Sequence, residues 1–340
     1  MTSAPTPEAR LRLAVVTPVY RDWESASLLC QALDEQCAHI PGVEMQVLLV
    51  DDGSPEEEGE QWEPPAPRWI RSIDVMLLRR NLGHQRAIAT GLCHIQERVP
   101  CDAVLIMDAD GEDRPEDAVR LVKRALEEPG QILFARRRKR LEGLVFRAGY
   151  SFYRFLHRIL TGVPVSVGNF SVVPRPFLNR LVCMPELWNH YAGAVFKSQL
   201  PFDSVPIDRG QRYRGRSRMN LVSLVNHGLA GIATFQDVVA TRILIAAVAG
   251  VLLTLAALAA VIGTRFFTGL AIPGWATYAA GLLLVLLLQL VALSFSLVFT
   301  LTANRANFPF LPSRDYRFFV EAVATRWPVS HESRIQPLQR

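Results

Sequence analysis

Short apolar runs alternate with a helical pattern between residues 13 and 107 of the chain. The apolar runs occupy residues 13–17, 45–50 and 103–107, and a stretch with helical periodicity spans residues 85–97. Polar or turn-forming residues follow each run, as expected where a buried strand reaches solvent. This alternation predicts a parallel, doubly wound α/β sheet.

Two much longer apolar segments follow in the last third of the chain. Residues 243–262 carry no charged side chain, and Gln289 is the one strongly polar residue between positions 279 and 301. A helix needs ~20 apolar residues to cross a bilayer. We therefore predict two transmembrane helices, at about residues 243–262 and 276–301, rather than buried core helices.

Composition supports a chain with a membrane part. The 340 residues are 50% hydrophobic, and the mean hydropathy is +0.16, which suggests about two domains, one of them in a membrane. The net charge of +5 fits attraction to anionic lipid headgroups, because no nucleic-acid-binding motif is present. The five cysteines are odd in number and lack CxxC spacing, which favours a reducing compartment.

The distribution of arginines predicts the orientation in the membrane. The connector between the two apolar segments carries Arg265 alone, whereas Arg305, Arg314 and Arg317 follow the second segment. The positive-inside rule then places the large N-terminal part and both termini in the cytoplasm, at the cell (inner) membrane. No charged-then-apolar leader is visible, so no cleaved signal peptide is expected.

Acidic residues follow the second and third apolar runs. Asp108 and Asp110 stand two residues apart after the third run, and such a pair can hold Mg²⁺ or Mn²⁺ against a diphosphate. Carboxylates at strand ends are also common turn formers, so the pair alone does not decide. Because ligands bind beyond the carboxyl ends of parallel strands, we expect Tyr20, Asp52 and Asp110 to gather at one pocket.

A series of short motifs resembles a known family. The motifs are Thr17–Tyr20, Val50–Ser54, Arg80–Gln85, Met107–Asp110, Gly168–Phe170 and Arg212–Arg218, followed by the two apolar segments. In order and spacing the chain resembles the inverting glycosyltransferases of GT-A fold, over about residues 12–305. Within them it is similar to the polyprenyl-phosphate glycosyltransferase group, which includes dolichol-phosphate mannose synthase.

The resemblance implies an activity and a set of partners. It implies a membrane-bound, metal-dependent enzyme that moves one sugar from a nucleotide-sugar donor to a polyprenyl phosphate carrier lipid and inverts the anomeric configuration. UDP- and GDP-linked donors both fit, Mg²⁺ or Mn²⁺ is the implied cofactor, and a homo-oligomer is possible.

The resemblance also assigns roles to residues. The implied catalytic residues are Asp110, Asn169 and Arg212, and the implied metal ligands are Asp108, Asp110 and Glu112. The implied nucleotide-sugar-binding residues are Pro18, Tyr20, Asp22, Asp52, Asn81, Gly83, Gln85 and Asp108. The implied acceptor- and phosphate-binding residues are Arg136, Arg212, Ser217 and Arg218. His84 is expected to be structural, and Asp113, Glu116 and Asp117 are expected at the start of a helix.

Four positions depart from the family pattern. Glu112 stands where the family often has Gln, and Arg218 and Met219 stand where the relatives have Lys and Tyr. Asn169 stands where the family often has Asp, and an amide orients groups but cannot remove a proton. A lipid phosphate needs no strong base, because its second pKa is about 6. Another acceptor would need one, and Asp203, Asp208 and His190 are reserve candidates.

The expected domain organisation follows the chain. A flexible N-terminus (1–11) precedes the GT-A domain (12–219), a juxtamembrane amphipathic helix (220–241), the two transmembrane helices (242–303) and a cytoplasmic tail (304–340). The basic run at residues 136–140 leads into a basic amphipathic stretch suited to the headgroup layer.

Two alternatives remain open at this point. The first is a transferase for another envelope lipid or glycan acceptor. A processive synthase is disfavoured within it, because two helices cannot enclose a pore and Val323 replaces the Gln expected before Arg326-Trp327. The second is a non-catalytic membrane protein that binds a nucleotide sugar, which Asn169 keeps open.

Overall fold

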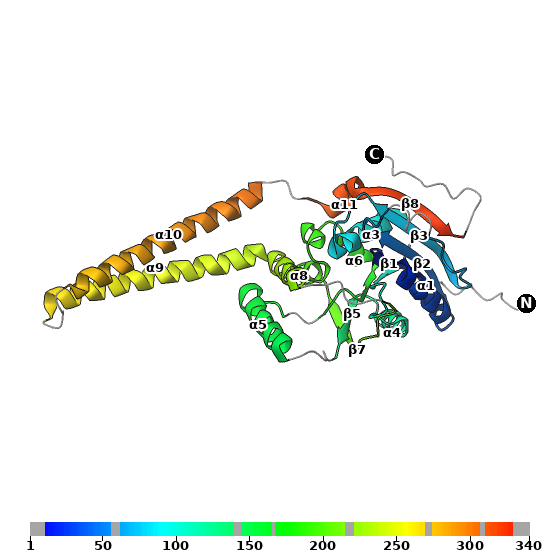
Figure 1. Ribbon diagram of the computed structural model, residues 1–340, viewed down its shortest axis with the longest axis horizontal. Coiled ribbons are helices and arrows are strands. Elements are labelled where there is room, and N and C mark those ends of the chain that lie inside the picture. Colours follow the sequence, from blue (N-terminus) through cyan, green and yellow to red (C-terminus); the bar gives the residue numbers. More distant parts are fainter. Residues whose placement is uncertain are drawn as a thin grey trace, which may run out of the picture. The chain divides into compact units, whose positions relative to one another are not determined.

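The structure is a computed structural model that describes residues 11–55, 62–138, 144–164, 167–214, 221–268, 274–306 and 310–328. It divides into two compact units (Figure 1). The sheet unit comprises residues 1–154, 164–234 and 310–340, and the helical unit comprises residues 155–163 and 235–309.

The sheet unit is built on a mixed eight-stranded sheet with the strand order β7-β5-β6-β4-β1-β2-β3-β8. The strands are β1 (Leu11–Val19), β2 (Val43–Asp51), β3 (Ile70–Leu78), β4 (Ala103–Ile106), β5 (Ile132–Arg137), β6 (Ser171–Pro174), β7 (Phe202–Ile207) and β8 (Val320–Trp327). The strands β4, β1 and β2 are parallel, as the alternating pattern predicts, and β3, which the pattern did not predict, is parallel to β2. Strands β6 and β8 run antiparallel to their neighbours, which the sequence pattern did not predict.

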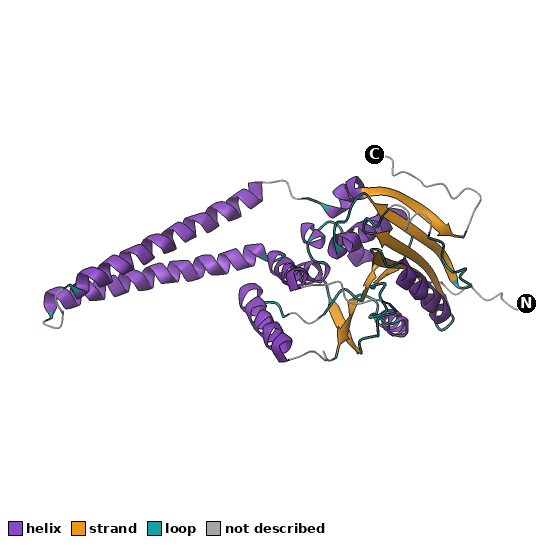
Figure 2. Cartoon of the chain, in the orientation of Figure 1, coloured by secondary structure: helices purple, strands orange, loops and turns teal. Residues whose placement is uncertain are grey.

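Helices cover both faces of this sheet (Figure 2). Helices α1 (Trp23–Cys37) and α4 (Pro115–Glu127) pack on one face, and α3 (His84–Arg98), α6 (Arg175–Leu181) and α7 (Tyr191–Lys197) pack on the other. Because strand residues alternate between faces, Leu13 and Val15 of β1 join the first core, and Ala14 and Val16 join the second. The predicted doubly wound α/β class is therefore confirmed.

The residues after the second apolar segment return to the sheet unit. They form α11 (Pro312–Asp315), the 3₁₀ helix η2 (Tyr316–Phe319) and β8, which pairs antiparallel with β3. The sequence predicted this segment only as a tail after the membrane helices, because the partner strand β3 lies about 250 positions earlier and no local pattern reveals the pairing. Residues 329–340 lie outside the described part of the chain.

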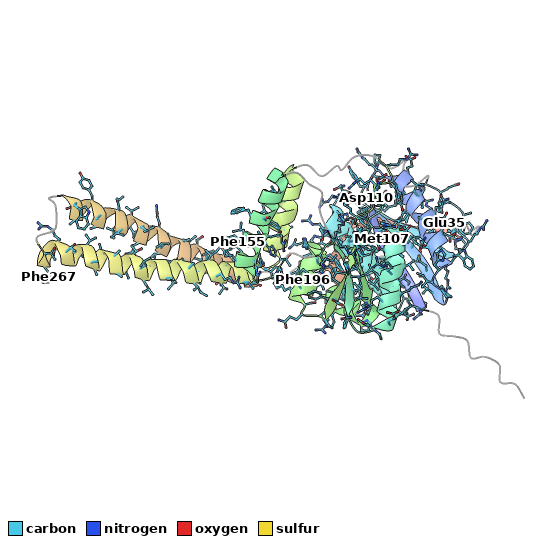
Figure 3. All side chains as sticks on the ribbon, turned by 90° about the horizontal axis from the view of Figure 1, so that it is seen from below. Glu35, Met107, Asp110, Phe155, Phe196 and Phe267 are labelled. Atoms are coloured by element: carbon cyan, nitrogen blue, oxygen red, sulfur yellow. The ribbon has the colours of Figure 1, made fainter. Side chains whose placement is uncertain are left out.

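The helical unit contains α9 (Gln236–Phe267), α10 (Trp275–Ala306) and the last turns of α5 (Leu144–Thr161). By length and composition, residues 236–267 and 275–300 could each cross a membrane, because each contains an 18-residue window with a mean hydropathy of 2.7. Side chains project along both helices, and Phe267 marks the end of α9 (Figure 3). The helices extend beyond the predicted spans. The expected juxtamembrane helix is α8 (Leu221–Ala233), which ends before α9 begins.

Candidate active site

The ends of β1, β2 and β4 bring the predicted site residues to one edge of the sheet. Val19 pairs with Asp51, and the backbone amide of Asp52 donates to the carbonyl of Val19 at 2.8 Å. Tyr20 and Asp52 therefore leave the sheet side by side. The Met107 amide donates to the Val16 carbonyl at 3.2 Å, so the acidic loop, residues 108–113, begins at the same edge.

Asp52 organises the neighbouring turn. Its buried carboxylate accepts the backbone amides of Leu82 at 2.6 Å and Gly83 at 2.9 Å. Burial raises the pKa of Asp52 to about 6. Gly83 has a φ of +91°, a conformation that favours glycine. Asp52 thus holds the turn that contains Asn81 and Gly83 against the end of β2.

Two other predicted nucleotide-binding residues lie at the end of β1 and in the loop that follows it. Pro18 is on β1, opposite Val50 of β2. Asp22 caps the N-terminus of α1, where its Oδ1 accepts the backbone amide of Ser25 at 3.4 Å. The Arg21 amide donates to Ser54 Oγ at 2.8 Å, which ties the loop after β1 to the loop after β2.

A chain of side-chain contacts links Asn169 to the acidic loop. The Tyr191 amide donates to Gln85 Oε1 at 2.8 Å, and Gln85 Nε2 donates to Asn169 Oδ1 at 3.2 Å. Asn169 Nδ2 then lies 3.1 Å from His84 Nε2. Since a backbone amide can only donate, it fixes the orientation of both side-chain amides and makes His84 Nε2 an acceptor.

His84 is a site residue that sequence reasoning missed. Its Nε2 atom lies 3.2 Å from Asp108 Oδ1, so the expected structural residue stands between Asn169 and the acidic loop. The sequence feature that could have identified His84 is its position directly before Gln85 in the motif of residues 80–85.

Asp108 and Asp110 present the carboxylates of the acidic loop. Asp108 Oδ1 is buried and receives no hydrogen bond of good geometry, and His84 Nε2 lies 3.2 Å from it. Asp110 accepts the Glu112 amide through Oδ1 at 2.9 Å, and its Oδ2 lies 2.7 Å from Arg212 Nη2. Burial, together with the charge of Asp108, raises the pKa of Asp110. Met107 and Asp110 are labelled in Figure 3.

These two carboxylates fit a hard divalent cation. An orphaned, buried carboxylate oxygen is a group that an ion would satisfy, and Mg²⁺ is commonly held by one or two carboxylates together with substrate phosphates. Among the described residues, no group of three or more His, Cys, Asp or Glu side chains is arranged to hold a metal. An ion here would therefore draw further ligands from the donor or from water.

Glu112 faces arginines instead. Its carboxylate accepts Arg209 through Nε at 3.0 Å and Nη2 at 2.6 Å, and Arg212 through Nε at 2.8 Å. Arg137 Nη1 lies 3.3 Å away, while its Nη2 donates to Asp113 at 3.1 Å. Burial opposes ionisation, but Arg209 and its neighbours hold the pKa of Glu112 below its usual range. The Glu112 carboxylate, which was predicted to bind the metal, is therefore already bound by three guanidinium groups.

Residues 208–214, here called the arginine loop, cross the acidic loop. The Gly210 amide donates to the Glu112 carbonyl and the Tyr213 amide donates to the Asp110 carbonyl, both at 2.9 Å. Arg136, predicted to bind the acceptor, is exposed on β5. Ser217 and Arg218, predicted for the same role, lie outside the described residues, as does position 219. Glu116 and Asp117 lie in the first turn of α4, as predicted, whereas Asp113 precedes the helix.

Two of the three reserve bases already accept hydrogen bonds from backbone amides. His190 caps α7, because its Nδ1 accepts the Gly193 amide at 3.0 Å. Asp203 lies on β7 and accepts the Ser204 amide at 2.7 Å. Asp208 is exposed at the start of the arginine loop. His190 and Asp203 therefore have evident structural roles.

Comparison with known proteins points to one family. Residues 14–181 match the model described as glycosyl transferase family 2. The chain is similar to the undecaprenyl-phosphate 4-deoxy-4-formamido-L-arabinose transferase of Enterobacter sp. (strain 638), with 27% identity over 64% of this chain and 66% of the relative. The protein of the same name from Klebsiella pneumoniae (strain 342) is 26% identical, over 63% of this chain and 64% of the relative. Each alignment thus spans just under two thirds of the relative.

Among solved structures, the chain is weakly similar to glucosyl-3-phosphoglycerate synthase from Mycobacterium tuberculosis in complex with Mn²⁺, UDP-glucose and phosphoglyceric acid. The TM-score is 0.48 at 17% identity, over 67% of this chain and 79% of that one.

Proposed function

This chain carries a glycosyl transferase family 2 domain, and from that premise we propose that it moves one sugar from a UDP- or GDP-linked donor to a polyprenyl phosphate, with inversion. The single observation that carries the proposal is the placement of Asp108 and Asp110 at the sheet edge, with Arg212 against Asp110. The names of the similar transferases favour a polyprenyl phosphate acceptor.

The acidic loop would serve the donor's diphosphate. Asp108 and Asp110 would hold Mg²⁺ or Mn²⁺, which when bound would neutralise charge developing on the leaving diphosphate. Arg212 adds a second positive charge on the protein side. Pro18, Tyr20, Asp22, Asn81 and Gly83 are the proposed lining of the nucleotide pocket, since they lie on the loops that meet at this edge.

The acceptor phosphate is the proposed nucleophile. Its oxygen forms a bond to the anomeric carbon as the bond from that carbon to the diphosphate oxygen breaks, and the electron pair leaves with the nucleoside diphosphate. Because a phosphate monoester is largely ionised near neutral pH, no protein base is needed. An amide at Asn169, held by Gln85, agrees with such an acceptor. Arg136, Ser217 and Arg218 are proposed to bind the acceptor phosphate.

The helical unit would anchor the enzyme. We propose that α9 and α10 span the inner membrane as a hairpin, with the sheet unit and both termini in the cytoplasm. Phe155 and Ile159 of α5 are exposed large apolar side chains in the same unit, and α8 exposes Val225 and Leu229. Such side chains suit the headgroup layer, where a carrier lipid presents its phosphate.

A transfer assay tests the proposal. The full chain in detergent is given Mn²⁺ or Mg²⁺, undecaprenyl phosphate and a panel of radiolabelled nucleotide sugars. Asp110→Asn is the test variant. Glu116→Gln is the matched control, because that exposed carboxylate of α4 pairs only with Arg114 among the contacts described for it.

We expect label to enter the organic phase with the unmodified enzyme and the control, and not with Asp110→Asn. Metal-dependent donor binding without lipid labelling would overturn the acceptor assignment and favour another acceptor or a non-catalytic role. Full transfer by Asp110→Asn would overturn the role of the acidic loop.

A further inference from the structure

Every acceptor position of the Glu112 carboxylate is in use. Oε1 receives Arg209 Nη2 at 2.6 Å and Arg212 Nε at 2.8 Å. Oε2 receives Arg209 Nε at 3.0 Å and Arg137 Nη1 at 3.3 Å. The side chain is only 9% exposed. A carboxylate offers about four lone-pair sites, so none is left for a cation.

A neutral amide at position 112 could not replace the Glu112 carboxylate as the partner of Arg209, Arg212 and Arg137. A glutamine at position 112 would offer one oxygen, and its NH₂ group would face guanidinium donors on the other side. Charge-assisted, bidentate hydrogen bonds of the kind that Arg209 makes are about twice as strong as neutral ones. This accounts for Glu where the family often has Gln.

Arg212 is shared between two carboxylates. Its Nε is bound to Glu112 at 2.8 Å, and its Nη2 lies 2.7 Å from Asp110 Oδ2. Nη2 therefore occupies an oxygen of a proposed cation ligand. A divalent cation at Asp110 would compete with Nη2 for that oxygen and repel it, whereas the bond from Nε to Glu112 involves the other end of the guanidinium.

We propose that Glu112 is a positioning residue rather than a metal ligand. It holds the arginine loop on the acidic loop and keeps Arg212 by its Nε atom, so that Nη2 passes from Asp110 to the donor's diphosphate when the cation binds. This inference rests on the proposed function, because it requires a cation at Asp110 and a diphosphate beside it.

The proposal predicts competition between Arg212 and the cation. Without nucleotide, Arg212→Gln removes the competitor, so Mn²⁺ affinity should rise by about threefold or more. With UDP or GDP present, the same variant loses the phosphate contact, so the gain in Mn²⁺ affinity caused by the nucleotide should fall about tenfold.

Glu112 is then tested through Arg212 in a double-mutant cycle. Mn²⁺ binding to the full chain in detergent is measured from the free-ion signal in electron paramagnetic resonance, with and without UDP or GDP. Glu112→Gln should reduce the nucleotide-linked gain about tenfold when Arg212 is present. In the Arg212→Gln background it should change Mn²⁺ affinity by less than about threefold.

Controls separate this role from misfolding and from failure of the proposed function. Glu112→Asp keeps the charge and should restore part of the nucleotide-linked gain, Glu116→Gln should change nothing, and thermal unfolding reports whether each variant folds. A tenfold loss of Mn²⁺ affinity from Glu112→Gln in both backgrounds would make Glu112 a ligand and overturn the inference. If Arg212→Gln binds Mn²⁺ no more tightly than the unmodified protein without nucleotide, Arg212 and the cation do not compete for Asp110. If Asp110→Asn leaves Mn²⁺ binding unchanged, the proposed cation site itself fails.

Discussion

Gly210 lies directly against Gly111, so that a Cβ atom on Gly210 would overlap the carbonyl oxygen of Gly111. A Cβ on Gly111 would in turn stand 2.9 Å from the Tyr213 ring, and Gly111 has a φ of +86°. The arginine loop can cross the acidic loop only because both positions lack side chains. The crossing of the two loops therefore places the guanidinium groups of Arg209 and Arg212 against the acidic loop.

Because the two loops cross at Gly210, we expect Gly210→Ala to lower the rate of sugar transfer. The added methyl group meets backbone atoms that cannot move aside, so the arginine loop must shift away from Asp110 and Glu112. We expect the transfer rate to fall at least tenfold while the sheet unit stays folded, as measured by the lipid-labelling assay and thermal unfolding. Gly149→Ala in α5 is the control, because a Cβ there meets nothing within 4 Å. Equal rates for the two variants would contradict this prediction.

Asp52→Asn should destabilise the sheet unit near pH 5. The amide would turn its NH₂ group toward a backbone donor, either Leu82 or Gly83. An unsatisfied buried polar group costs about 1–3 kcal/mol. Chemical unfolding of the full chain measures this loss, and a variant as stable as the unmodified protein would show that the two amides find other acceptors.

The same variant should alter the pH dependence of stability. Burial raises the pKa of Asp52 to about 6 in the folded state, with Asp51 adding to the effect and His84 opposing it, against about 3.9 unfolded. The folded state therefore binds the proton more tightly, and this contribution is present below about pH 4 and is lost as pH rises to about 6. The shift corresponds to at most about 3 kcal/mol. Unfolding curves from pH 4 to 7 should show this component in the unmodified protein and not in Asp52→Asn.

Tyr316→Phe should loosen the C-terminal return to the sheet. Tyr316 is fully buried, and its hydroxyl donates to Glu97 of α3 at 2.5 Å. Losing this bond to a charged group should cost about 1.5–3 kcal/mol in unfolding free energy. Phe318→Leu is the control, because Phe318 is 76% exposed, and should stay within about 0.5 kcal/mol. A loss for Tyr316→Phe that also stays within about 0.5 kcal/mol would mean that the hydroxyl contributes nothing measurable.

Asn169→Asp should not accelerate transfer. The carboxylate still accepts from Gln85 but cannot donate to His84, and it adds negative charge near Asp108. Since an ionised lipid phosphate needs no base, we expect a rate equal to or a few-fold below the unmodified enzyme. Asn169→Leu removes the contacts to both Gln85 and His84 and should lower the rate at least tenfold. Initial rates at pH 6–8 decide, and a tenfold gain for Asn169→Asp would indicate an acceptor that requires deprotonation.

The sequence alone determined those features of the protein that depend on residues close together in the chain. Alternating apolar runs predicted the parallel strands β1, β2 and β4, because burial on both faces leaves a local apolar signature. The lengths of the apolar segments predicted α9 and α10 for the same reason. The pair Asp108 and Asp110 was identified from its position after a strand, and the family match over residues 14–181 agrees with the resemblance that the motifs suggested.

Tertiary structure decided what depends on partners far along the chain. Glu112 is indistinguishable from a metal ligand in sequence, and its role changes because Arg209 and Arg212 lie 97 and 100 positions later. His84 joined the site through Asn169, 85 positions away. Strand β8 pairs with β3, although α9 and α10 lie between them in the sequence. Such contacts depend on how the folded chain brings distant segments together, and no periodicity within either segment records them.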